Sequence, residues 1–231
     1  MTRRQARPQT SVDDASPARR LPSFAIVVRD LDTGLHPYLA LLPKAVESPA
    51  MTRILDHGPA PATFLREVRV RISAERGYAH VDDEAREIVL AEGYYREGSA
   101  LDLYLDLLHE LTHIRQLSQG HDLWNESFAY HDRPTEVEGY AVAVEEGRRL
   151  GFTEAAVLEH LKNPWMSRAE VRRLLGHIDA FLGGGPLPHA AEALRGAPFV
   201  VRHPWRCPRA GTDSVRPAAE GQRRCLQVAP R

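Results

Sequence analysis

The chain has 231 residues, of which 43% are hydrophobic, and its formal net charge at pH 7 is −1. This length and composition fit one globular domain with a core and short appendages. No stretch approaches the roughly 18 apolar residues of a membrane span, and the N-terminus lacks the apolar segment of a secretory signal. Two cysteines give no disulfide framework, so we expect a cytoplasmic protein.

The charge is divided unevenly between the ends and the middle of the chain. Residues 1–20 hold five Arg against two Asp, and 195–231 hold eight Arg against two acidic residues, which gives +3 and +6. Since the whole chain carries −1, residues 21–194 carry −10. This acidic middle argues against a nucleic-acid surface. We predict one domain, 21–195, between disordered basic tails at 1–20 and 196–231.

The hydrophobic pattern predicts strands in the first half of that domain. The apolar run 24–28 is typical of a short buried strand, and three prolines divide 35–55 into one or two short helices. Apolar and charged residues alternate from 67 to 73, as in a half-exposed strand, and 86–92 is another strand candidate. Turn residues separate these segments, so we predict a small antiparallel sheet before the helices.

Start and stop residues predict helices in the second half. Ser99 and Asp102 form a helix start of capping-box type, and Gly120 ends this helix. Ser167 and Glu170 form a second capping box, followed by an apolar stripe typical of a core helix. Further helices are predicted at 134–150 and 153–161. The sequence therefore predicts an α+β fold.

The helix predicted at 99–120 carries the sequence His-Glu-Leu-Thr-His at 109–113, an H-E-x-x-H pattern. Residues four apart share one helix face, so His109 and His113 can bind one metal ion, and Glu110 beside them can act as a general base. With 11 His in the chain, a chance match is an alternative. The apolar repeat around the pattern is that of a buried helix, which favours a zinc site.

Two residues of the following helix compete for the role of third ligand. Glu136 and Glu138 lie about 200° apart around the helix axis, so both cannot face one metal ion. Glu136 lies at the margin of the apolar face, whereas Glu138 shares the polar side with Glu145. We therefore predict Glu136 as the ligand. The apolar face used for this prediction consists of Val137, Tyr140, Ala141 and Val144.

The H-E-x-x-H pattern at 109–113 and the following helix with Glu136 and Glu138 resemble the two motifs of the gluzincin-type zincin metallopeptidases. The resemblance covers about residues 67–150. The resemblance implies a zincin-like fold in which His109, His113 and Glu136 hold Zn²⁺. It also implies peptide-bond hydrolysis by a zinc-bound water that Glu110 activates. The chain differs from the family in having Gly at 139, where Ala is usual, and Tyr at 140, where Asp or Asn is usual.

The implied substrate is a peptide or protein, which the strand at 86–92 could hold by edge pairing. Hydrolysis also needs a donor for the oxyanion. The candidates near the motifs in sequence are Tyr130, His131, His121 and Tyr140.

Two other functions stay open at the level of sequence. The domain could be a non-catalytic zinc-binding module with a structural or regulatory role, although Glu110 would then have no use. Alternatively, the helices around 153–162 and 167–182 could form a helix-turn-helix assisted by the basic tails. The acidic middle of the chain argues against this second function, and we expect no nucleic-acid or membrane partner.

Overall fold

The computed structural model describes residues 20–56 and 58–189, so the predicted basic tails lie outside it except for Arg20. The described part is an α+β fold, and none of its helices is long and apolar enough to cross a membrane. Its strands are β1 (Gly34–Pro37), β2 (Arg69–Ser73), β3 (Ala79–Asp82) and β4 (Glu87–Ala91). Its α-helices are α1 (Tyr38–Leu41), α2 (Ala50–Leu55), α3 (Pro61–Glu67), α4 (Glu92–Glu97), α5 (Ala100–Ser118), α6 (Pro134–Arg149), α7 (Glu154–His160) and α8 (Arg168–Leu182). Short 3₁₀-helices are η1 (Ser23–Ala25), η2 (Ala45–Glu47) and η3 (Tyr130–Asp132).

The four strands form a mixed sheet in the order β1-β2-β4-β3. Strands β2 and β4 are parallel, and the other two pairs are antiparallel, so the prediction of an antiparallel sheet was wrong for this pair. Burial explains the order. Residues 88–91 of β4 are all buried, as expected for a strand covered on both faces, whereas β3 buries only Val81 and lies at the edge.

The prediction of a strand at 24–28 was also wrong. Its first residues form η1, and the rest has no regular structure. The run is nevertheless part of the core, because Ala25 and Val27 are buried. The segment 35–55 does contain two short helices, α1 and α2, but it also supplies most of β1, which pairs with β2.

The helices of the second half begin where their capping residues predict. The Ser99 side chain accepts a hydrogen bond from the Asp102 amide at the start of α5. A complete capping box of Ser167 and Glu170 precedes α8. Local side-chain-to-backbone bonds of this kind need no tertiary context, which is why the sequence predicts them well.

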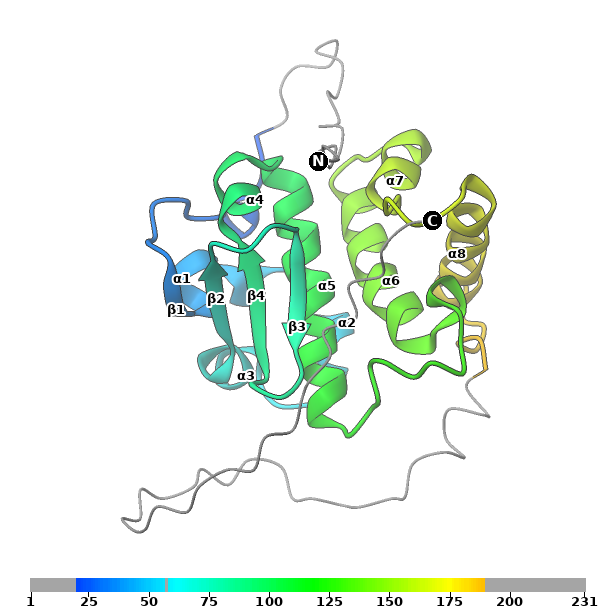
Figure 1. Cartoon of the computed structure of the whole chain (residues 1–231), viewed down its shortest axis with the longest axis horizontal. Coiled ribbons are helices and arrows are strands. Elements are labelled where there is room, and N and C mark those ends of the chain that lie inside the picture. The colour runs from blue at the N-terminus through cyan, green and yellow to red at the C-terminus, as the bar shows by residue number, and fades with distance from the viewer. Residues whose placement is uncertain (1–19, 57, 190–231) are drawn as a thin grey trace, which may run out of the picture. The chain divides into compact units, whose positions relative to one another are not determined.

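Helix α5 packs against both the sheet and α6, and α6 packs against α8 on its other side (Figure 1). One hydrophobic core joins the sheet, α5 and the N-terminal helices, and a second joins α6, α7 and α8. Helix α6 belongs to both, since Ala143 lies in the first core and Val137 in the second. Helix α5, which carries the H-E-x-x-H pattern, is therefore held between the sheet and α6.

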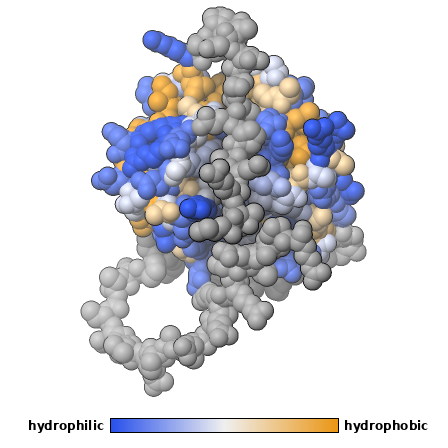
Figure 2. Space-filling model, turned by 45° about the horizontal axis from the view of Figure 1, so that its top comes forward, coloured by the Kyte–Doolittle hydropathy of each residue, from blue (hydrophilic) through white to orange (hydrophobic). Residues whose placement is uncertain are grey.

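On the face drawn in Figure 2, hydrophilic side chains surround small hydrophobic areas. Among the described residues, the large hydrophobic side chains left exposed are Ile26, Leu35, Val46, Trp124 and Trp165. Isolated exposed apolar residues are normal on protein surfaces. Only one that adjoins a candidate site calls for a functional explanation.

An ionic contact attaches α8 to η3. Asp132 Oδ1 accepts hydrogen bonds from Arg173 Nε at 2.6 Å and from His177 Nε2 at 2.9 Å. Burial by itself raises the pKa of the Asp132 carboxyl, but His177 and Arg173 outweigh it and hold that pKa below its usual range. A lowered folded-state pKa stabilises the fold above the unfolded pKa of about 3.9, and this stability is lost as pH falls through the folded pKa.

We therefore expect Asp132→Asn to lower the free energy of unfolding by about 1–2 kcal/mol at pH 7, because charge-assisted bonds are replaced by weaker ones. The difference from the wild type should begin to shrink as pH falls below about 4 and should vanish only below the folded pKa of Asp132, as measured by urea unfolding at pH 7 and at a series of acidic pH values. Asp179→Asn is the control, since Asp179 pairs with Arg148 with its side chain 48% exposed. A loss that is independent of pH would contradict this assignment.

Candidate metal centre

The structure brings three predicted ligands together in the interior, with His109 and His113 on α5 and Glu136 on α6. The two imidazole Nε2 atoms are 2.8 Å apart. Glu136 Oε2 lies 3.4 Å from the His109 nitrogen and 3.7 Å from the His113 nitrogen. All three side chains are buried. This buried group could bind a metal ion.

The geometry and the donor set fit a divalent cation. Ligand atoms at about 2.0–2.1 Å from a tetrahedral Zn²⁺ are about 3.3 Å from one another, and the three observed separations lie around this value. Glu136 Oε2 is buried and accepts no hydrogen bond from any described residue. An unsatisfied carboxylate oxygen that faces two imidazole nitrogens is what a cation between them would satisfy.

The protonation equilibria of the three groups favour a bound positive charge. Burial raises the pKa of Glu136, but the two histidines outweigh burial and lower that pKa below its usual range. Burial and the neighbouring His113 lower the pKa of His109. Burial also lowers the pKa of His113, but the Glu136 carboxylate outweighs it and raises the value to about 9. Without a metal, one proton thus compensates the carboxylate, and metal binding would displace it.

Hydrogen bonds orient His113. Its Nδ1 donates to Gln116 Oε1 at 2.7 Å, since an amide oxygen can only accept, and this leaves Nε2 of the neutral ring free to bind a metal. The Gln116 amide nitrogen donates to Glu138 at 2.7 Å, and Glu138 pairs with Arg115 at 2.7 Å. Glu138, the competing candidate, therefore supports a ligand instead of facing the site.

Packing orients the side of the His109 ring that carries Nδ1. Its Nδ1 is buried without a hydrogen-bond partner among the described residues. The Tyr140 ring lies against the His109 ring, with 4.2 Å between their centroids. Gly139 lies next to the edge of the His109 ring that carries Nδ1. A Cβ on Gly139 would lie 2.9 Å from His109 Nδ1. The two departures from the gluzincin pattern thus both occur at the surface on which His109 rests.

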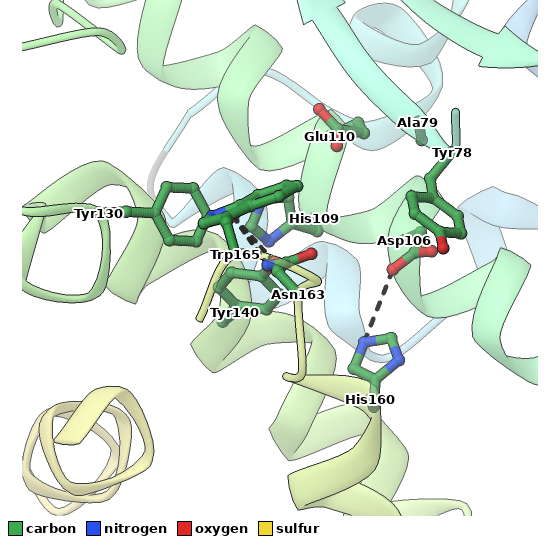
Figure 3. A pocket seen from close by; sticks show the side chains of 10 residues that line it. All are labelled: Tyr78, Ala79, Asp106, His109, Glu110, Tyr130, Tyr140, His160, Asn163 and Trp165. Carbon is green, nitrogen blue, oxygen red and sulfur yellow. Dashed lines mark hydrogen bonds and ion pairs between the residues drawn. The ribbon is translucent and has the colours of Figure 1, made fainter. Parts of the chain in front are cut away.

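Glu110 opens into a pocket that His109 also lines (Figure 3). Tyr78 and Ala79, at the start of β3, lie on one side of His109 in this view, and Tyr130 lies on the other. Burial raises the pKa of the Glu110 carboxyl to about 8. The carboxyl makes no hydrogen bond to any described residue, so it is available to a molecule in the pocket.

Two of the four candidates for the oxyanion donor line this pocket. They are Tyr130 and Tyr140, whose hydroxyl groups are 2.9 Å apart. Asn163 Nδ2, which the sequence did not indicate, donates to the Tyr140 hydroxyl at 3.0 Å. The pocket lining does not include His121 or His131.

The pocket also contains an acid–imidazole pair that sequence reasoning missed. Asp106 Oδ1 lies 3.7 Å from His160 Nε2, and the Tyr94 hydroxyl donates to the other Asp106 oxygen. Asp106 precedes His109 by three residues and therefore shares its helix face, a signal that the sequence did contain. His160 lies on α7, and only the tertiary fold brings it here.

Comparisons of the chain with protein-family models, with curated proteins and with solved structures find no match. Inference about this site therefore depends on its own residues and geometry.

We expect Glu136→Ala to abolish tight metal binding, because the carboxylate ligand is lost. Glu138→Ala keeps all three ligands but removes the acceptor shared by Gln116 and Arg115, so we expect a loss of affinity of about 10-fold. Competition with a chromophoric chelator measures both affinities. Equal losses in the two variants would contradict the assignment of Glu136 as the ligand.

Gly139→Ala should weaken metal binding by at least about 10-fold, because the new Cβ pushes against the His109 ring and misdirects its nitrogen. Gly176→Ala on α8 is the matched control, since a Cβ there meets no atom within 4 Å. It should leave metal affinity unchanged and stabilise the helix by about 0.5–1 kcal/mol. Unchanged affinity in Gly139→Ala would show that the close contact does not constrain the site.

Proposed function

We propose that the chain is a zinc-dependent metallopeptidase with a zincin-like fold, which hydrolyses peptide bonds in a peptide or protein substrate. One observation carries the proposal. The Glu110 carboxyl opens into the same pocket as His109, beside a buried group of three potential metal ligands. A ligand set of two His and one Glu is typical of catalytic zinc sites, which keep a fourth position open for water or substrate.

In this proposal His109, His113 and Glu136 hold the zinc ion. When bound, zinc would polarise the substrate carbonyl and lower the pKa of water towards neutrality. Glu110 accepts the proton of the attacking water on its carboxylate and delivers it to the nitrogen of the leaving amine. Burial raises the pKa of this carboxyl, which makes it a stronger base than an exposed glutamate.

The free edge of β3 supports an extended peptide as the substrate. The Tyr78 carbonyl accepts a hydrogen bond from the Ala91 amide, so in this antiparallel pair the backbone groups of Ala79 and Val81 point away from β4. They are available for pairing with another strand. The prediction that the strand at 86–92 holds the peptide by edge pairing was wrong, because this strand is β4 and β4 is paired on both sides.

Tyr130 is our candidate for the oxyanion donor. Burial, followed by the Glu136 carboxylate, raises the pKa of its hydroxyl well above the usual value, so the group keeps its proton. A chain of donors running from the Asn163 amide to Tyr140 and then to Tyr130 would direct the Tyr130 proton away from Tyr140 and towards the Glu136 carboxylate. With that carboxylate bound to a metal ion, the proton would be available to a substrate oxygen. Tyr140 then acts through Tyr130.

The alternative is a non-catalytic zinc-binding module. The ligands alone would serve it equally well. It gives no reason, however, for a buried carboxyl at Glu110 that costs free energy to ionise and makes no hydrogen bond to a described residue.

We expect Glu110→Gln to keep the metal and the fold but to lose hydrolysis by about 10²- to 10⁴-fold, because the amide cannot accept a proton. Turnover of a broad peptide panel and metal content should be measured on the same zinc-loaded samples. His109→Ala is the control that loses both metal and activity. Wild-type turnover by Glu110→Gln would end the proposed mechanism, and metal binding without turnover by the wild type would favour the non-catalytic module.

A further inference from the structure

The segment between α7 and α8 makes a tight turn at the rim of the pocket. The Met166 amide donates to the Asn163 carbonyl at 3.0 Å, which closes a four-residue β-turn. Pro164 occupies the second position of this turn, where its fixed φ is favourable, and Trp165 occupies the third. The turn is therefore predisposed to hold Trp165 in one place.

Both residues that flank the Pro-Trp pair are anchored. The Asn163 amide nitrogen donates to Tyr140 at 3.0 Å and approaches the Tyr130 hydroxyl at 3.5 Å. Met166 packs against the core formed by α6, α7 and α8. The same amide that orients the two tyrosines thus also fixes the turn that presents Trp165.

Trp165 is the most exposed of the large hydrophobic residues in the described part of the chain, with 64% of its surface accessible. It lines the same pocket as His109 and Glu110. Its ring meets Tyr130 edge to face, with 5.8 Å between centroids. In Figure 3 it lies beside Tyr130, on the side of the pocket away from Tyr78 and Ala79. A large apolar surface exposed at the rim of a site is suited to a ligand.

We propose that Trp165 is a specificity-determining residue, which packs against a large apolar or aromatic side chain next to the scissile bond. This inference rests on the proposed peptidase function and names its substrate class. With the substrate backbone paired to β3, a neighbouring side chain can reach across the pocket to the Trp165 and Tyr130 rings. An aromatic ring or a branched aliphatic group would bury apolar area there.

The rim that carries Trp165 offers no charged partner to a substrate side chain. The two carboxyl groups of the pocket are Asp106, which binds Tyr94 and lies beside His160, and Glu110, which handles the proton. Neither carboxyl group belongs to the rim, which consists of the uncharged residues Asn163, Pro164 and Trp165. Attraction at this rim is therefore apolar.

The test is a cleavage profile of the full-length zinc-loaded protein on a complex peptide mixture, read by mass spectrometry. The wild type should enrich Phe, Tyr, Leu or Met at one of the two positions that flank the scissile bond. For two synthetic peptides that differ only in Phe or Ala at that position, we expect Trp165→Ala to reduce the ratio of their kcat/KM values by about 10-fold. Trp165→Phe should preserve most of the ratio, because it keeps an aromatic face.

Trp124→Ala is the matched control, because Trp124 is also exposed but does not line the pocket, and it should leave the ratio unchanged. Cleavage without an apolar preference, or with a preference for basic or acidic residues, overturns the role of Trp165 while the peptidase function stands. An unchanged ratio of the two kcat/KM values in Trp165→Ala would also overturn the role of Trp165 and leave the peptidase function standing. Absence of cleavage by the zinc-loaded wild type overturns the proposed function, and this inference with it.

Discussion

The close approach of α5 and α6 is the constraint on which the candidate site depends. Glycines make it possible at two points, since a Cβ on Gly139 would meet His109 and one on Gly147 would meet Phe152 and Leu105. Buried hydrogen bonds join the helices at both ends, from Tyr104 to Glu146 and from Gln116 to the Thr135 carbonyl. Only at this separation can the short reach of Glu136 bring its carboxylate to two imidazoles of the opposite helix.

The two imidazoles are held by different physical means. A chain of polar groups through Gln116, Glu138 and Arg115 fixes the tautomer of His113. His109 rests on Gly139 and Tyr140 instead, and its Nδ1 remains without a hydrogen-bond partner among the described residues. A buried unsatisfied group costs about 1–3 kcal/mol, which coordination of a cation through the other ring nitrogen would offset. The orientation of His109 therefore depends on the packing of α6 more than on any single polar partner.

Local signals made the helices predictable, because a capping side chain such as Ser99 or Ser167 bonds its own helix. Sheet order was not predictable, since the inner place of β4 follows from cover on both faces. The prediction of Glu136 as a member of the buried group was right, but its reasoning was only partly right, since Tyr140 alone of the apolar face used for it lies against His109. The apolar face used for it packs on α7 and α8, while Glu136 shares the side of Gly139 and Glu146 that meets α5. Because α6 is buried on two sides, its sequence has no single apolar face from which the side facing α5 could be predicted.

In the proposed peptidase, the order of the strands and the α7–α8 turn together would decide which substrates the pocket accepts. Because β4 fills the inner place, the outward backbone groups of Ala79 and Val81 stand at the sheet edge beside α5. Backbone pairing at such an edge recognises an extended chain but not its sequence. Across the pocket, the turn presents side-chain surface, which distinguishes one residue type from another. In the proposed peptidase, selection between substrates would therefore come from the α7–α8 side, and α7 is attached to α5 through the contacts of His160 with Asp102 and Asp106.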